Sequence, residues 1–204
     1  MKKNFKYPLI LTAIFILGFS SMLQAQSVYK INDSKDIDMK LSGTSTLHSW
    51  SMDAKTFSGN ADFNFKPGDA AALSSIKSLT FSLAVANLKS GESGLDKNAY
   101  KALNTKEYKD IDYKLLSATV TPEGENKFLV KAHGNLTIAG VTKEVLMNVH
   151  CVVSKNGNIT CTGSETLNMT DYAVKPPKFM LGTMKTGDAI TLDFTLVYTK
   201  SSAI

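Results

Sequence analysis

The sequence predicts an all-β domain, a closed antiparallel barrel of about eight strands with one short helix. Apolar residues recur at every second position along most of the chain, which is typical of half-buried antiparallel strands. A helical pattern occurs once, near residues 94–104, so no series of strand–helix–strand crossovers is indicated. Closure into a barrel removes the exposed edges of an open sheet, and a sandwich is the alternative.

The first 25 residues have the pattern of a secretory signal peptide. Three lysines precede an apolar run from Leu9 to Phe19, and small or neutral residues lead to Ala25. The run is too short to span a bilayer, and an uncleaved anchor is the alternative. We therefore expect a periplasmic or secreted protein that does not span the membrane after cleavage, with one domain over residues 26–204.

Removal of the signal peptide also changes the charge. It takes three lysines and no acidic residue, which leaves 20 basic and 18 acidic residues. The remaining charges are scattered and form no basic run. We therefore exclude nucleic acid as a partner.

Alternating segments predict the strands in chain order. Phe63 and Phe65 alternate with polar residues, and Leu79, Phe81 and Leu83 share the inward face of the next segment. The predicted strands cover residues 37–42, 57–66, 79–85, 111–120, 127–138, 145–153, 159–169 and 190–198.

The helix is predicted from its start and its apolar face. Ser93, with Asp96 three residues later, resembles a capping box. Leu95, Ala99 and Leu103 fall on one side of the helix that follows. We expect this helix to lie against the sheet.

A hairpin is predicted between Ala132 and Val153, with a tight turn at Ala139-Gly140. Apolar residues alternate on both sides of this turn, so one face of each strand is buried. The buried face carries no catalytic group. Alternation by itself leaves open whether this face packs into a filled core or lines a hollow one.

Cys151 and Cys161 are the two cysteines of the chain, and residues 154–158 between them suit a hairpin loop with Gly157 in the left-handed conformation. In that register the two cysteines are directly opposite each other. A cross-strand disulfide is predicted in an oxidising compartment, and two small buried thiols are the alternative.

An irregular segment between Met169 and Asp188 is long for a hairpin and apolar for a solvated loop. We interpret it as a flap or plug over one end of the sheet, and a loop packed outside the sheet is the alternative. Its large side chains belong to Tyr172, Phe179, Met180, Leu181 and Met184.

Residues 136–145, LTIAGVTKEV, resemble the YceI family of exported, lipocalin-like barrels, whose best-known members bind polyisoprenoid lipids. Residues 43–48 (GTSTLH) and 187–191 (GDAIT) support this resemblance, which extends over residues 28–200. Lys109-Asp110 stand where family members often have a proline, and STLHSW at residues 45–50 differs from the commoner form. These departures indicate a divergent branch.

No pattern indicates catalysis, a metal or a cofactor. Nucleophile-elbow, phosphate-loop, dinucleotide and zinc-protease motifs are absent. His133 and His150 are out of phase with the apolar positions, so we expect them to face solvent. Glu165 is in phase with Ile159 and Cys161, either as a polar anchor for a ligand head group or as a solvated rim residue. We predict no enzymatic activity.

We predict an exported protein that sequesters or carries a long apolar molecule, such as a polyisoprenoid lipid or a quinone. Each buried methylene contributes about 0.8 kcal/mol, so such a site needs shape and dryness more than marked residues. The alternative is a structural or interaction module of the cell envelope, with a filled barrel and no ligand. The predicted ligand-binding residues are Phe63, Phe65, Leu79, Phe81, Leu83, Tyr113, Leu136, Ile138, Val145, Met147, Val149, Phe179, Met180 and Phe194.

Overall fold

The computed structural model describes residues 28–31, 36–179 and 184–201. The predicted signal peptide lies outside these residues, and so do Met180 and Leu181 of the predicted flap. The elements are β1 (Val28–Ile31), β2 (Asp38–Ser45), β3 (Ser49–Ala54), β4 (Ser58–Lys66), β5 (Asp69–Ala84), η1 (Val85–Asn87), α1 (Ser93–Ala102), β6 (Asp110–Gly124), β7 (Lys127–Ile138), β8 (Val141–Val153), β9 (Ile159–Asn168), η2 (Met169–Tyr172), β10 (Lys178–Phe179) and β11 (Met184–Lys200).

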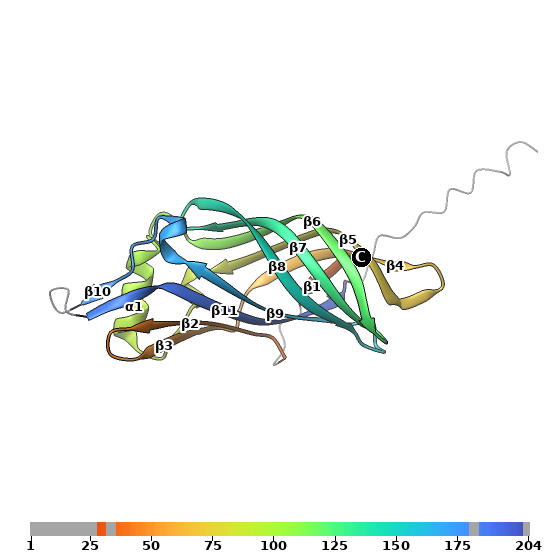
Figure 1. Ribbon diagram of the computed structural model, residues 1–204, viewed down its shortest axis with the longest axis horizontal. Helices are drawn as coiled ribbons and strands as arrows, with labels where there is room; N and C mark the ends of the chain where they lie inside the picture. Colours follow the sequence, from red (N-terminus) through yellow and green to blue (C-terminus); the bar gives the residue numbers. More distant parts are fainter. Residues whose placement is uncertain (1–27, 32–35, 180–183, 202–204) are drawn as a thin grey trace, which may run out of the picture.

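Eight strands form an antiparallel ring in the order β1-β4-β5-β6-β7-β8-β9-β11 (Figure 1). Strand β1 closes the ring, because Tyr29 pairs with Ala61 of β4 on one side and with Lys200 of β11 on the other. The prediction of an all-β, eight-stranded antiparallel barrel with one short helix is confirmed.

The hairpin β2–β3 extends the sheet beyond this ring. Strand β2 pairs with the first part of β11, and β3 pairs with β2. The outer edge of β3 is joined to the chain after β5, because Asp53 and Lys89 exchange two backbone hydrogen bonds of 2.8 and 2.9 Å. Strand β1 therefore closes the ring of strands. At the other side of the sheet, the Asp53–Lys89 bridge joins the outer edge of β3 to the segment that follows β5.

Strand β7 and the hairpin that follows it follow the predicted alternation closely. Every even-numbered position of β7 from Phe128 to Ile138 is buried. At the turn, Ala139 and Gly140 have φ angles of 47° and 79°, which suits the right-handed twist of the strands that they join. The Tyr108 ring covers this turn and would lie 2.3 Å from a Cβ atom at Gly140. Both conformation and space therefore favour glycine there.

The helix α1 begins near the predicted position, but its predicted cap is wrong. Ser93 makes no capping hydrogen bond. Asp96 instead binds the loop before the helix, because the Oγ and the backbone N–H of Ser90 donate to Asp96 Oδ1 at 2.7 and 2.8 Å. The aspartate thus lies in the first turn of the helix, where its charge is favourable, and fixes the loop that precedes it.

The barrel is elongated, and its two ends differ (Figure 1). One end carries α1 and β10, together with the tip of the β2–β3 hairpin. The other end carries β1 and the β4–β5 turn. Neither α1 nor any other described helix is long and apolar enough to cross a membrane.

Candidate functional site

The barrel encloses a cavity of about 170 Å³. Inward-facing side chains of β4 to β9, β11 and β2 line it, and Leu88 and Leu103 complete the wall near α1. Among the described residues of this wall, only Tyr113, Tyr198, Glu165 and the two cysteines are polar. We refer to this space as the main cavity.

A second cavity of about 80 Å³ lies beside it, under α1 and η2. Leu95 and Ala99 of α1 and Tyr172 of η2 line the second cavity. Five residues line both spaces, so the second cavity continues the main one toward the end of the barrel. These shared residues are Leu41, Leu88, Leu103, Ile138 and Ile190.

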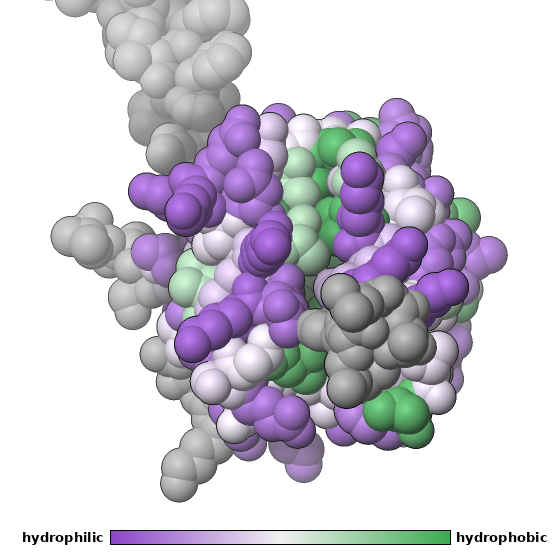
Figure 2. All heavy atoms as spheres, turned by 90° about the vertical axis from the view of Figure 1, so that its left-hand side faces the viewer, coloured by the Kyte–Doolittle hydropathy of each residue, from purple (hydrophilic) through white to green (hydrophobic). Residues whose placement is uncertain are grey.

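Apolar surface is visible at the α1 end of the molecule. Seen from that end, green apolar residues are recessed between purple polar side chains (Figure 2). Apolar side chains therefore reach the surface at this end of the molecule.

The opposite end is closed by packed aromatic rings. The ring of Phe63 lies 5.3 Å from those of both Tyr29 and Tyr198, in edge-to-face arrangements. The exposed fractions are 5% for Tyr29, 3% for Phe63 and 0% for Tyr198. This end has the close packing of an ordinary protein core.

Gly134 and Tyr113 shape the middle of the main cavity. Gly134 occupies a buried, inward position of β7, and a Cβ atom there would lie 2.4 Å from Tyr113 Cζ and from its Oη. The tyrosine ring therefore lies directly over the glycine. Because residue 134 has no side chain, the Tyr113 ring can pack directly on the backbone of β7.

The hydroxyl groups of Tyr113 and Tyr198 are buried and have no hydrogen-bond partner among the described residues. Burial raises the pKa of Tyr113 to about 12. Burial also raises the pKa of Tyr198 well above its ordinary value, with smaller contributions from Cys161, Cys151 and Tyr113. Both hydroxyls are therefore neutral donors. A buried hydroxyl that lacks a hydrogen bond costs about 1–3 kcal/mol of stability.

Cys151 and Cys161 face each other across β8 and β9, as the predicted register requires. Both cysteines are buried free thiols in the structure, and the hydrogen bond between the two thiols, together with burial, raises the pKa of Cys161. The pair is satisfied internally as two thiols. Disulfide formation in an oxidising compartment stays a prediction.

Glu165 is the acidic residue of the main cavity wall. It is half-buried and pairs with Leu192 on the neighbouring strand β11. Loss of water around the carboxyl raises its pKa. Its inward phase, inferred from the sequence, therefore agrees with its place in the wall.

Ten of the predicted ligand-binding residues lie in the wall of the main cavity. Side chains on one face of each strand point into the barrel, and the antiparallel register brings the inward positions of neighbouring strands side by side. These residues are Phe63, Leu79, Phe81, Leu83, Tyr113, Leu136, Ile138, Met147, Val149 and Phe194.

Two predicted residues lie elsewhere. Phe65 is half-buried and packs 6.3 Å from the Tyr29 ring, beyond Phe63 and toward the β4–β5 turn. Val145 is half-buried opposite Gly134, where the Tyr113 ring fills the adjacent space. The alternation along each strand predicted the correct face for both residues. It could not show that aromatic rings of other strands would lie between them and the cavity.

The predicted flap is described in part. Tyr172 and Val174 are buried, with exposed fractions of 3% and 4%, and both line the second cavity. Met180 lies outside the described residues, and the described part of Phe179 is its backbone, which pairs with Met184. The first half of the segment thus packs under the α1 end of the barrel.

Several wall residues were not predicted. Tyr198, Leu192 and Leu196 share the alternation of Phe194 along β11, so that pattern could have identified them. Leu88 and Leu103 flank α1 and come from segments without strand periodicity. Only the tertiary packing of the helix brings these two into the wall.

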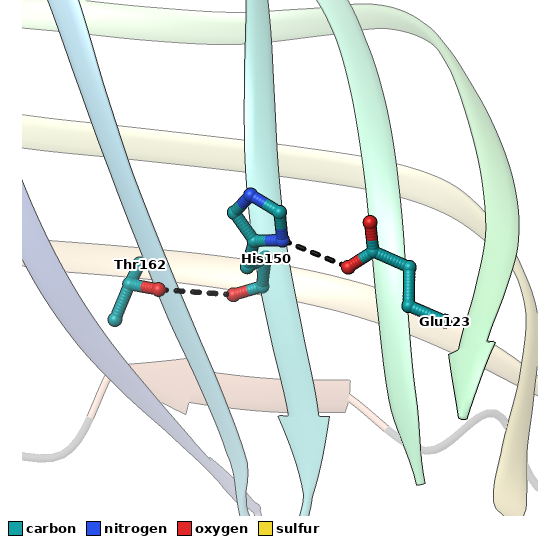
Figure 3. A network of polar contacts seen from close by, with 3 residues as sticks. All are labelled: Glu123, His150 and Thr162. Atoms are coloured by element: carbon teal, nitrogen blue, oxygen red, sulfur yellow. Dashed lines mark hydrogen bonds and ion pairs between the residues drawn. The ribbon is translucent and has the colours of Figure 1, made fainter. Parts of the chain in front are cut away.

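The predicted outward histidines lie on the outer surface of the barrel. His133 Nε2 is 2.9 Å from Glu144 Oε2. His150 Nδ1 is 2.8 Å from Glu123 Oε2, which reaches across β7, and the Thr162 hydroxyl donates to the His150 carbonyl at 3.4 Å (Figure 3). Such exposed pairs contribute little to stability, and the described residues contain no cluster of three metal-binding side chains.

Comparison with known proteins identifies a family for this barrel. The model of the YceI-like domain matches residues 29–198. No curated protein matches the chain.

Several solved structures share the fold at low sequence identity. BcnA of Burkholderia cenocepacia is 19% identical, with a TM-score of 0.63, over 83% of this chain and 99% of that protein. A polyisoprenoid-binding domain from Saccharophagus degradans is 12% identical, with a TM-score of 0.65, over 86% and 99%. A YceI protein of Campylobacter jejuni is 19% identical, with a TM-score of 0.52, over 71% and 82%.

Proposed function

The chain belongs to the YceI-like domain family, and we propose that it binds a long apolar molecule, such as a polyisoprenoid or an isoprenoid quinone, inside its barrel. The observation that carries this proposal is the main cavity, whose wall is almost entirely apolar. The polyisoprenoid-binding domain from Saccharophagus degradans supports it, since it shares this fold.

Burial of hydrocarbon supplies the driving force. Each methylene moved from water into the cavity gains about 0.8 kcal/mol, so one five-carbon isoprenoid unit gains roughly 4 kcal/mol before the cost of ordering the chain. No specific polar contact is needed for binding of this strength. The site acts by shape and by exclusion of water.

The size of the cavities limits how such a molecule is held. An apolar protein cavity of about 150 Å³ takes up benzene, so the main cavity of about 170 Å³ holds roughly one or two isoprenoid units without rearrangement. A longer chain continues through the second cavity and past α1. The α1 end is therefore the proposed entrance.

We further propose that the protein is exported and acts in the periplasm or outside the cell, by sequestering or carrying its ligand. The basic start and apolar run of residues 1–25 support export. The proposal is a binding role without catalysis, and the YceI-like family and the polyisoprenoid-binding domain that shares this fold support it. The alternative of a filled, ligand-free barrel has less support, because the interior is partly hollow.

Organic extraction of the protein from its native host, followed by mass spectrometry, tests the proposal. We expect one class of apolar molecule in near-stoichiometric amount. Ala132→Phe, which fills the main cavity, should lose it, whereas Lys131→Phe on the outer face of the same strand should retain it. Both variants must show cooperative unfolding. Protein that is always free of ligand, or equal retention by both variants, would contradict the proposal.

A further inference from the structure

The tip of the β2–β3 hairpin presents a leucine to solvent at the α1 end of the barrel. Leu47 is 67% exposed, the highest value among the large apolar side chains that the structure describes. The turn that carries it is held by hydrogen bonds, because Ser45 donates to the His48 carbonyl from its N–H at 2.9 Å and from its Oγ at 2.8 Å. The exposure of Leu47 is therefore a property of an ordered turn.

This hairpin tip is attached to the start of β11. The Thr46 N–H donates to the Lys185 carbonyl at 3.0 Å, and the Lys185 N–H donates to Thr46 Oγ1 at 3.2 Å. Lys185 also lies directly opposite Lys178 in the short ladder between β10 and β11. We call Lys178 and Lys185 the lysine pair. Leu47 and the lysine pair therefore belong to one joined surface at the α1 end (Figure 1).

The lysine pair has no acidic counterpart nearby. Both lysines are exposed, and neither forms an ion pair with an acidic residue that the structure describes. Like charges directly opposite each other across two strands repel. The chain has 18 acidic residues, but none lies between Asp38 and Asp53 or between Asp171 and Asp188, the two segments that meet here. An anionic partner would therefore relieve an unbalanced positive charge on this surface.

The lysine pair also borders the second cavity. Pro177 and Thr186 are its neighbours in sequence, and both line that cavity. The Thr186 N–H donates to the Pro177 carbonyl at 3.0 Å, so the two strands are joined at this point. The positive surface thus lies beside the proposed entrance of the barrel. An entrance that rests on a lipid surface receives an apolar molecule without exposing it to water.

We propose that the α1 end of the barrel docks on an anionic phospholipid surface, with Leu47 inserted among the lipids and the lysine pair at their phosphate groups. One inserted apolar group alone gives only marginal attachment, and basic charge beside it makes the attachment stable. Both signals are present on this surface. Docking uses the outside of the barrel, so it does not require a bound ligand.

Co-sedimentation of the mature protein, residues 26–204, with lipid vesicles tests the proposal. We compare vesicles of phosphatidylcholine with vesicles in which about one third of the lipid is phosphatidylglycerol. Binding to the anionic vesicles should be at least about tenfold tighter, since each lysine near an anionic membrane contributes about a fivefold increase. It should be lost near 1 M salt, where the Debye length falls to about 3 Å. Absence of binding to the anionic vesicles at low salt would overturn the proposal.

Leucine variants test the insertion of the hairpin tip. Leu47→Ser should weaken binding to the anionic vesicles by about fivefold, because less apolar surface leaves water. Leu146→Ser is the matched control, since Leu146 is 66% exposed but lies on β8, in the side wall of the barrel. It should bind as the wild type does. A fluorophore attached to Leu47→Cys should shift to the blue when vesicles are added, and one attached to Leu146→Cys should not.

Lysine variants test the charge. Lys178→Gln combined with Lys185→Gln should weaken binding to the anionic vesicles by about 25-fold and should leave the weak binding to phosphatidylcholine unchanged. The control combines Lys114→Gln with Lys131→Gln, two exposed lysines on the side wall. Its binding should change by less than about twofold. Equal losses in both double variants would show unspecific attraction of charge and would overturn the proposal.

A soluble polyanion distinguishes a lipid surface from an acidic protein partner. If polyglutamate binds as tightly as the anionic vesicles, and Leu47→Ser has no effect on either, the surface suits a soluble acidic partner and the proposal fails. The result is also separate from the ligand of the barrel. Protein without ligand that still binds anionic vesicles would contradict only the proposed function. Protein with ligand that does not bind them would contradict only the docking.

Discussion

Gly134 shows how one residue without a side chain sets the shape of the interior. Its neighbours at the inward positions of β7, Ala132 and Leu136, carry side chains that line the main cavity, whereas the space over Gly134 is taken by the Tyr113 ring. The glycine thereby determines where the Tyr113 hydroxyl lies. A side chain at residue 134 would occupy the space that the Tyr113 ring takes.

Gly134→Ala should therefore disturb the barrel. Its Cβ would approach the Tyr113 ring to 2.4 Å, and relief of this contact should cost about 1–3 kcal/mol in the free energy of unfolding. Urea denaturation measures this cost. The control Gly94→Ala lies in α1 with no atom within 4 Å of the new Cβ and should be neutral or slightly stabilising. Equal stability of the two variants would show that Tyr113 moves aside freely.

Strand phase predicted most of the wall at the level of single residues. Phe81, Met147 and Phe194 lie in the wall because alternation within a strand depends on the backbone alone. The sequence could not predict that the Tyr198 hydroxyl lacks a hydrogen-bond partner among the described residues, since this depends on the polar groups of all the strands around it. The same is true of Val145, which the ring of a distant tyrosine separates from the cavity.

The helix α1 is held over the second cavity by the hydroxyl of Tyr100. This hydroxyl accepts a hydrogen bond from Lys89 Nζ at 2.8 Å and donates to the Leu88 carbonyl at 2.7 Å. The helix itself contains no buried residue. Its attachment to the barrel therefore combines these hydrogen bonds, to the chain that follows β5, with the packing of partly buried Ala99 and Ala102 against the core.

Tyr100→Phe should loosen this attachment. Loss of both hydrogen bonds should reduce the free energy of unfolding by about 1–2 kcal/mol and accelerate amide exchange in α1 before the strands are affected. If α1 covers the entrance, release of a bound apolar probe should also become faster. Tyr108→Phe is the control, because that hydroxyl bonds to exposed Glu107. Unchanged exchange in α1 would contradict the assignment.

The existence of most elements was predictable, but their edges and attachments were not. Long alternating strands such as β7 and β8 dominate the sequence pattern. Strand β1 has four residues, and β10 has two, so neither is long enough to show a period. The bond between Ser90 and Asp96 was not predicted because this serine lies six residues before Asp96, outside the spacing of a capping box.

At the scale of the whole molecule, the barrel depends on four residues for its closure. Strand β1 joins β4 to the end of β11, and Tyr29 contributes the buried side chain at the centre of this joint. The same ring packs on Phe63, so closure of the sheet and closure of the cavity share one contact. Sequence pattern predicted a closed barrel but not which strand would close it.

Tyr29→Ala should weaken the whole barrel. Removal of a buried aromatic ring costs about 3–5 kcal/mol and opens the packed end of the main cavity. The midpoint of urea unfolding should fall accordingly, and binding of an apolar probe should weaken. Lys30→Ala, an exposed neighbour on the same strand, should change stability by less than about 0.5 kcal/mol. Similar midpoints for both variants would show that β1 adds little to the ring.

The pairing of β1 with the last residues of β11 also has a kinetic consequence. Residues 29–31 meet residues 198–200, so the contact that completes the ring joins segments from opposite ends of the described chain. Contacts of such long sequence separation form late and slow the folding of β-rich proteins. While the chain is still being synthesised, β1 and β9 lack β11, the strand that pairs with both of them, and each presents an unpaired edge. The barrel can form only after its last strand has become available.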